Sequence, residues 1–320
     1  MGKGKHNAAI YILSSRTNTL KKALEYFYKN WNNEYDYPVY IHHFDDIYDK
    51  EYIEDIQKNI SDRITFHQVE YGVPSHIKEE ELFYNRSYLQ YVRTSFPKSR
   101  LGYLHMEYFS SMLYNFGEKG CPVKELEQYD YLMRIDDDSW FKEPIDFDFF
   151  DAVQEHPIAT AFTWNHCGLN HVETRENLWS FYLDYLNSRS IDPFSIKSDQ
   201  LRQAVLDGDD MKMHTLKWSC GNFNIYNVKM FMESNFKDWM DSVNEFGGHY
   251  KHRWGDLDVL GLFTYTNFEK AVNDLDLRNR GLYEPKLPET EVPVGGYAPS
   301  VQDTTSRIEH EKSICNVFVQ

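Results

Sequence analysis

The sequence lacks several features that define well-known classes of protein. No apolar run approaches the ~20 residues of a membrane-spanning helix, and no secretory signal precedes the first strand-like segment. The four cysteines stand far apart and form no C-x-x-C pair, which excludes a zinc ribbon and a dense disulfide framework. Acidic residues outnumber basic ones by 50 to 34, so a nucleic acid is not an expected partner. These absences predict a cytoplasmic protein without an integral membrane segment.

Strand-like and helix-like segments alternate at the start of the chain. Apolar and β-branched runs predict strands over 8–14, 38–44 and 63–69. Helical spacing predicts one helix capped by Asn18 or Thr19 and another over 50–60. This β-α-β-α-β order predicts a parallel sheet with right-handed crossovers, of a nucleotide-binding type. An aromatic fraction of 16% supplies a large core.

The remaining chain continues as an α/β protein, and we expect residues 1–285 to form one domain. Further helices are expected over 101–116, 144–153, 173–186, 236–246 and 253–263, and further strands over 129–135, 157–164 and 218–228. Segment 71–100 has no clear period and is interpreted as a lid or an insertion, and 192–210 as a polar surface excursion. Residues 286–320 are rich in proline, glycine and polar residues, which predicts a tail or a strap over the surface.

Three adjacent aspartates follow the expected strand at 129–135. Asp136 and Asp138 lie two positions apart, so in an extended segment they point to one side, while Asp137 faces a ribose or a backbone amide. Neighbouring carboxylates repel one another, and Mn²⁺ or Mg²⁺, which prefer oxygen ligands, would remove that repulsion. The position beyond a strand end predicts Asp136 and Asp138 as metal ligands at the ligand-binding edge of the sheet. A solvated acidic turn is the alternative.

A second polar cluster reads R-W-G-D-L-D from Arg253 to Asp258. A carboxylate beside an indole ring is a common arrangement for binding a sugar, so Arg253, Trp254 and Asp258 are predicted to contact the sugar or the acceptor. Asp256 is predicted to orient or deprotonate an acceptor hydroxyl. The structural alternative is that an acidic residue at the head of a helix is favoured by the helix dipole.

Two asparagines precede this cluster in the expected strand at 218–228. Asn222 and Asn224 alternate with apolar residues, so both amides face the same side of the strand. They either line the site or lie on a solvated face. We favour the site, with Asn222 on the sugar side.

Several segments resemble the fungal Golgi α-1,2-mannosyltransferase family. Y-L-H-M-E-Y-F-S-S at 103–111 is similar to that family's Y-R-H-M-C-R-Y-N-S, and Y-D-Y-L-M-R-I-D-D-D at 129–138 is similar to its Y-D-W-Y-W-R-V-E-P-D. G-N-F-N-I at 221–225 and G-G-H-Y-K-H-R-W-G-D at 247–256 resemble S-N-F-E-I and G-G-F-F-Y-E-R-W-G-D. Order and spacing agree over about residues 8–276.

The resemblance implies a GT-A-like α/β fold, with a mainly parallel central sheet flanked by helices. It implies metal-dependent, retaining transfer of mannose from GDP-mannose, a nucleotide-sugar donor, to a glycan or glycoprotein acceptor. Arg134, Asp136 and Asp137 would then bind the donor, and Asp256 and Asn224 would hold the catalytic positions.

The chain departs from this family at informative positions. The family's acidic residue in S-N-F-E-I, a proposed nucleophile, falls on Asn224, and an amide cannot attack a sugar carbon as a carboxylate can. A front-face transfer stabilised by the metal and the leaving diphosphate survives this change. Family cysteines fall on Glu107, Glu143 and Lys217, which agrees with a reducing compartment. The family's C-terminal histidine has no evident counterpart over 274–283.

Three alternatives remain open from the sequence. The replaced residues equally accompany a donor sugar other than mannose. The amide at Asn224 makes a catalytically dead glycan- or nucleotide-binding module credible. A metal-dependent phosphohydrolase also uses clustered aspartates, but it usually needs a second carboxylate set for two metals, and no histidine-rich segment supplies one.

Overall fold

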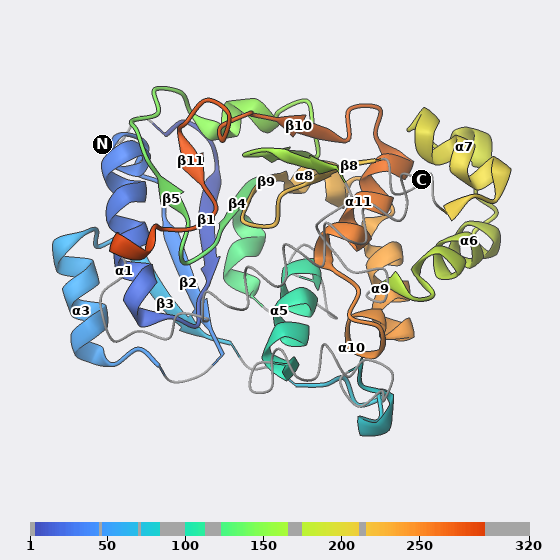
Figure 1. Ribbon diagram of the computed structural model, residues 1–320, viewed down its shortest axis with the longest axis horizontal. Helices are drawn as coiled ribbons and strands as arrows, with labels where there is room; N and C mark the ends of the chain where they lie inside the picture. Colours follow the sequence, from blue (N-terminus) through green and yellow to red (C-terminus); the bar gives the residue numbers. More distant parts are fainter. Residues whose placement is uncertain are drawn as a thin grey trace.

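A seven-stranded sheet forms the centre of the protein (Figure 1). The structure is a computed structural model that describes residues 4–44, 47–69, 72–83, 100–112, 123–165, 175–210 and 216–291. The strand order is β10-β6-β9-β4-β1-β2-β3. The strands are β1 (Ala8–Leu13), β2 (Val39–His43), β3 (Ile64–Gln68), β4 (Tyr131–Ile135), β6 (Ile158–Thr160), β9 (Phe223–Asn227) and β10 (Val272–Asp274).

The first part of the chain forms the parallel half that its β-α-β-α-β order predicts. Strand β1 pairs in parallel with both β2 and β4, and β2 pairs in parallel with β3. Helices α1 (Thr17–Phe27) and α3 (Lys50–Asn59) connect these strands. Asp49 caps α3 by accepting a hydrogen bond from the Tyr52 N–H at 2.8 Å. The predicted cap of α1 is wrong, because that helix follows directly on Arg16 and has no side-chain cap.

The other half of the sheet is mixed. Strand β9 pairs antiparallel with β4 and β6, while β6 and β10 are parallel. The strand expected over 157–164 divides, since β6 ends at Thr160 and β7 (Thr163–Asn165) pairs with β8 (Lys217–Ser219) outside the main sheet. A further two-stranded ribbon joins β5 (Trp140–Phe141) to β11 (Tyr283–Glu284).

Helices pack on both faces of the sheet. Ala8, Ile10 and Ile12 of β1 belong to one core cluster, together with residues of α1, whereas Ala9 and Tyr11 belong to another. This alternation is expected of a strand that is buried on both faces. The second cluster lies under α5 (Arg100–Met112), α6 (Leu178–Ser188), α9 (Phe236–Phe246) and α11 (Asp256–Asn267).

Two expectations about helices and loops change, and two others lie partly outside the described residues. The excursion expected over 192–210 contains helix α7 (Asp199–Asp207), which Ser198 caps and Gly208 ends in the left-handed region. Within 144–153 only the 3-10 helix Phe149–Val153 forms. Most of the predicted lid at 71–100 lies outside the described residues, as does the end of the helix expected over 101–116.

The segment after β11 runs beside the acidic turn. The Leu287 N–H donates to the backbone carbonyl of Asp138 at 2.8 Å. This contact is consistent with a strap, although 292–320 lies outside the described residues. No helix in the part of the chain that the structure describes is both long enough and apolar enough to cross a membrane.

Candidate active site

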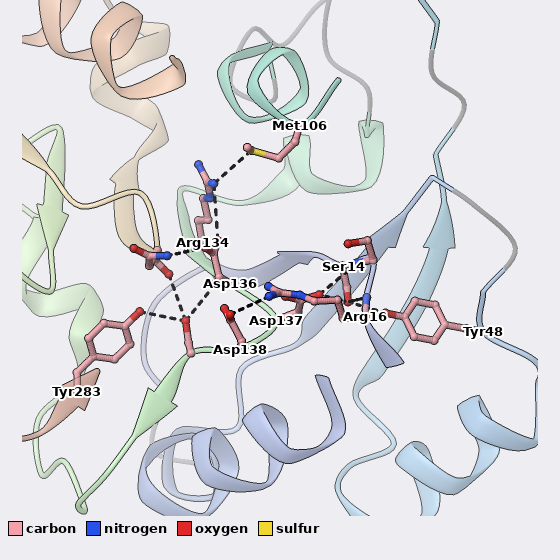
Figure 2. A network of polar contacts seen from close by, with 12 residues as sticks. Ser14, Arg16, Tyr48, Met106, Arg134, Asp136, Asp137, Asp138 and Tyr283 are labelled. Carbon is pink, nitrogen blue, oxygen red and sulfur yellow. Dashed lines mark hydrogen bonds and ion pairs between the residues drawn. The ribbon is translucent and has the colours of Figure 1, made fainter. Parts of the chain in front are cut away.

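The three aspartates lie where β1 and β4 end side by side (Figure 2). Parallel pairing of these strands brings residues 14–16, beyond β1, to residues 136–138, beyond β4. Asp137 accepts hydrogen bonds from Ser14 Oγ at 2.7 Å and from the Ser15 N–H at 3.2 Å. The three aspartates therefore lie at the carboxyl ends of β1 and β4, as predicted.

Arg16 is the main counter-charge of this turn, and sequence reasoning missed it. Its guanidinium pairs with Asp137 through Nη2 and with Asp138 Oδ2 through Nη1, the latter at 2.8 Å. Burial by itself would lower the pKa of Arg16, but Asp137 and Asp138 outweigh it and the pKa rises. Arg16 is therefore firmly charged. The signal in the sequence was a basic residue directly after the first strand.

Arg16 pairs with only two of the three carboxylates, and the cation nearest Asp136 is Arg134, whose Nη2 lies 3.7 Å away. Burial raises the pKa of Asp138 to about 6, with Arg16 opposing the shift and the two neighbouring aspartates adding to it. Burial also raises the pKa of Asp136. The turn therefore holds more negative charge than its protein partners balance, which favours a positively charged ligand.

Asn222 lies against the acidic turn. Its side-chain Nδ2 donates to Asp136 Oδ2 at 2.7 Å, and its backbone carbonyl accepts from the Asp136 N–H at 3.0 Å. Asn222 thus contacts Asp136, a predicted donor and metal residue, and also accepts from Ser139 Oγ at 3.4 Å, whereas it was predicted on the sugar side.

Arg134 joins the acidic turn to the second polar cluster. This buried residue of β4 lies 3.7 Å from Asp136 Oδ1 through Nη2, and its Nη1 pairs with Asp256 Oδ2. Figure 2 shows Arg134 pointing away from Arg16, toward Met106 of α5, whose sulfur lies 3.8 Å from Nη2. This contact joins Arg134 to Asp256, which lie 122 positions apart in the sequence. Both residues were predicted as site residues.

Asp256 begins helix α11 and Glu107 faces it from α5. The preceding residue, Gly255, has no side chain to cap the helix, and the Glu107 carboxyl accepts the Asp256 N–H at 2.8 Å. Burial, and then the charge of Asp256, raise the pKa of Glu107 to about 8. Asp258, also buried, lies 3.4 Å from the Arg175 guanidinium. Glu107 and Arg175 were not predicted as site residues.

Asn224 is fully buried in β9. It lies opposite Arg134 of β4 and Thr160 of β6 in the strand registers. Neither its Oδ1 nor its Nδ2 has a hydrogen-bond partner within the described residues. Buried amides are normally paired, so this unpaired amide beside Arg134 favours a polar ligand at this place.

Trp254 requires a correction, because it does not offer its indole face to a sugar. It is completely buried, with the ring of Phe246 stacked at 5.0 Å and that of His252 at 5.8 Å. A Cβ at Gly248 would lie only 1.9 Å from the indole, so this ring packs directly on backbone. Arg253, at a φ of 57°, instead places its guanidinium 4.5 Å from the ring centre of Tyr103.

The acidic turn offers the right ligand chemistry for Mn²⁺ or Mg²⁺, but few protein ligands. No group of three or more histidine, cysteine or acidic residues among those described is disposed to hold a metal ion. Asp136 and Asp138 contribute hard oxygen atoms. Magnesium-like ions are commonly held by one or two carboxylates plus substrate phosphates. The residues therefore fit a cation that a phosphate ligand helps to hold.

Comparisons with known proteins agree with this description. A family model described as glycolipid 2-alpha-mannosyltransferase matches residues 2–271. The glycolipid 2-alpha-mannosyltransferase of Saccharomyces cerevisiae is 27% identical over 135 residues, 42% of this chain and 29% of that protein. The O-glycoside alpha-1,2-mannosyltransferase omh1 of Schizosaccharomyces pombe is 23% identical over 259 residues, 79% of this chain and 63% of that protein. The matched parts thus span less than two thirds of these relatives.

A solved structure resembles the whole architecture. Core-mannan synthase A from Aspergillus fumigatus, in its Mn/GDP form, superposes with a TM-score of 0.68 at 18% identity, covering 95% of this chain and 82% of that one. This similarity confirms the predicted α/β fold of GT-A type with its mainly parallel central sheet.

Proposed function

The chain belongs to the glycolipid 2-alpha-mannosyltransferase family, and from this premise we propose that it transfers mannose from GDP-mannose to a hydroxyl of a glycan. Membership confirms the family that the sequence motifs indicated. The single observation that carries the proposal is the under-neutralised turn Asp136–Asp138 at the sheet edge, joined through Arg134 to the buried carboxylate of Asp256.

The donor would bind at the acidic turn. Asp136 and Asp138 would hold Mn²⁺ or Mg²⁺ against its diphosphate, and Asn222 and Arg134 keep the Asp136 carboxylate in place. When bound, such a cation neutralises the negative charge that develops on the leaving nucleotide. The Mn/GDP form of core-mannan synthase A supports this assignment by its fold alone. Asp137 contacts Ser14 and Arg16, so its role would be to fix the conformation of the turn.

The acceptor side would centre on Asp256. Its ion pair with Arg134 fixes the carboxylate at the start of α11, beside β4. A carboxylate so placed orients an acceptor hydroxyl or accepts its proton. Asp258 is paired with Arg175, so its role would be to support the start of α11. The Arg253 guanidinium lies over the ring of Tyr103.

Retention of configuration would proceed without a covalent intermediate on Asn224. An amide is not a nucleophile, and this one belongs to a buried residue of β9. A front-face transfer is compatible with an amide that only contacts the sugar. The same observation supports the alternative of a binding module that has lost catalysis.

The domain and its location are part of the proposal. Residues 1–285 would form one catalytic domain and 286–320 a strap, supported by the contact of Leu287 with the acidic turn. A cytoplasmic location stays a prediction. It draws support from Glu107, Glu143 and Lys217 at family cysteine positions.

A transfer assay tests this function. The protein is incubated with Mn²⁺, GDP-mannose and methyl α-mannoside, with UDP-glucose as the control donor, and the product's anomeric proton is examined by NMR. We expect a new α-linkage between the transferred mannose and the acceptor, formed with GDP-mannose but not with UDP-glucose. A β-linked product would contradict retention and make Asp256 a general base. Tight GDP-mannose binding without transfer or hydrolysis would favour the binding module.

A further inference from the structure

Glu107 and Asp256 form a carboxyl pair that is closed off from solvent. Glu107 is 4% exposed on α5, and Asp256 is 5% exposed at the start of α11. The Asp256 N–H donates to Glu107 Oε2 at 2.8 Å, which brings the Glu107 carboxyl group to the residue that carries the second carboxyl group. Two ionised carboxylates are acceptors only, so a direct hydrogen bond between these side chains requires one proton.

The charges around this pair also favour a proton. Arg134 is the guanidinium bonded to Asp256, and it faces Asp136 as well. From the segment before α11, the charge of Arg253 opposes the raised pKa of Glu107, and the Arg253 guanidinium lies over the ring of Tyr103. From α10 (Gly248–Lys251), His249 is neutral, because burial lowers its pKa to about 4. These two guanidiniums face three carboxylates, of which Glu107 and Asp256 are buried and Asp136 is partly exposed, so a proton on one of the buried carboxyl groups is favoured.

We propose that Glu107 is a positioning residue that carries this proton and donates it in a hydrogen bond to the Asp256 carboxylate, which holds Asp256 in its pair with Arg134. Its second oxygen accepts the Asp256 N–H and so caps α11. The proposal deepens the function assigned to Asp256 and rests on it for its effect on turnover. The proton itself is tested separately, by stability.

Ionisation of Glu107 would work against this arrangement. Burial and Asp256 hold the pKa of Glu107 at about 8, so the residue loses its proton as the pH rises through that value. The pair then carries two negative charges beside one guanidinium. Asp256 would be displaced from the position in which Arg134 and Glu107 hold it together.

The pH dependence of stability tests the shared proton without any substrate. In the unfolded chain Glu107 titrates near its ordinary pKa of about 4.3. The folded state therefore binds one proton more between that value and about pH 8, so wild-type stability falls as the pH rises across this window. Glu107→Gln keeps a donor and an acceptor but cannot ionise. Its stability relative to wild type should rise steadily from about pH 4.5 to about pH 8.

The measurement is the denaturation midpoint of both proteins at several pH values, with Glu155→Gln as control. Glu155 is a surface carboxylate paired with Lys270, so its substitution should give a nearly constant difference. A constant difference for Glu107→Gln as well would show that Glu107 is ionised in the folded protein, and would overturn the proposal.

Turnover tests the positioning role. We expect Glu107→Ala to lose at least about tenfold in kcat, because the reacting carboxylate is no longer held, and Glu107→Gln to restore most of it. In the wild type we expect kcat to fall as the pH rises through about 8, when Glu107 loses its proton. This fall should be absent in Glu107→Gln. Equal losses in both variants would overturn the positioning role. If the protein transfers no mannose at all, the proposed function fails while the stability result still decides the shared proton.

Discussion

Two groups of carboxylates lie on either side of Arg134 and differ in their surroundings. The Asp136–Asp138 turn lies at a strand end, where Asp137 and Asp138 are buried but the Asp136 side chain is 29% exposed, and Arg16 supplies most of the counter-charge. The pair of Asp256 and Glu107 lies between two helices, with both residues buried. Its charge is balanced by Arg134 and, in our account, by a proton.

The two groups suit different ligands because their exposure and charge balance differ. A partly exposed turn with too few cations suits a ligand that brings its own positive charge, such as a metal with a nucleoside diphosphate. A closed pair that is balanced internally cannot take a cation, but it can hold one carboxylate in a fixed direction. Arg134 contacts both groups, so donor and acceptor sides share one buried cation.

The largest expected effect is on stability, when the shared cation is removed. Arg134→Met leaves Asp256 and Asp136 without their guanidinium and should lower the free energy of unfolding by about 3–5 kcal/mol. The matched control is Arg189→Met, which breaks a half-exposed pair with Asp238 and should cost less than about 1 kcal/mol. Urea denaturation measures both. Similar small losses would mean that Arg134 does not hold the two groups together.

The next effect falls on the open turn alone. Asp138→Asn keeps the side-chain shape but removes a charge, and turnover should fall at least ~100-fold, as is typical for lost electrostatic stabilisation at a reacting centre. Stability should change little, because Arg16 keeps its pair with Asp137. Asp199→Asn, at a highly exposed site, is the control. A loss below tenfold with the fold intact would reduce the three aspartates to an acidic turn.

The smallest effect is expected at Asn224. Asn224→Ala removes an amide without described partners, so kcat should fall by less than about tenfold, whereas Asp256→Asn should cost far more. Steady-state kinetics of both variants under the same conditions make this comparison. If Asn224→Ala proves the more damaging change, the roles assigned to Asn224 and Asp256 are wrong.

Local patterns predicted the parallel half of the fold well. Strands β1 to β3 and helix α3 lie within a residue or two of their expected bounds, because apolar runs and a capping aspartate are local signals. Helix α7 was missed although Ser198 and Gly208 are ordinary start and stop signals. Its polar composition concealed them. The division of the strand at 157–164 depends on pairing with distant segments, which the sequence does not display.

The sequence indicated Asp136, Asp256 and Arg134 as candidate site residues. It did not indicate Arg16, Glu107 or Arg175, which contact aspartates of the candidate site. Asp136 and Asp256 stand out in the sequence, but Arg16 reaches the turn only because β1 pairs with β4. The indole of Trp254 adjoins Asp256 in sequence, yet its position was decided by packing against Gly248 and Phe246. Burial of this kind follows from tertiary contacts, which no local pattern contains.

Calorimetry of GDP binding tests whether Asp136 and Asp138 hold a cation for the donor. GDP is titrated into the wild-type protein in Mn²⁺ and in EDTA, with Asp138→Asn in Mn²⁺ as the matched variant. We expect clear binding only for wild type in Mn²⁺, since carboxylates and a diphosphate repel each other unless a cation joins them. Equal affinity in Mn²⁺ and in EDTA would contradict the role assigned to Asp136 and Asp138.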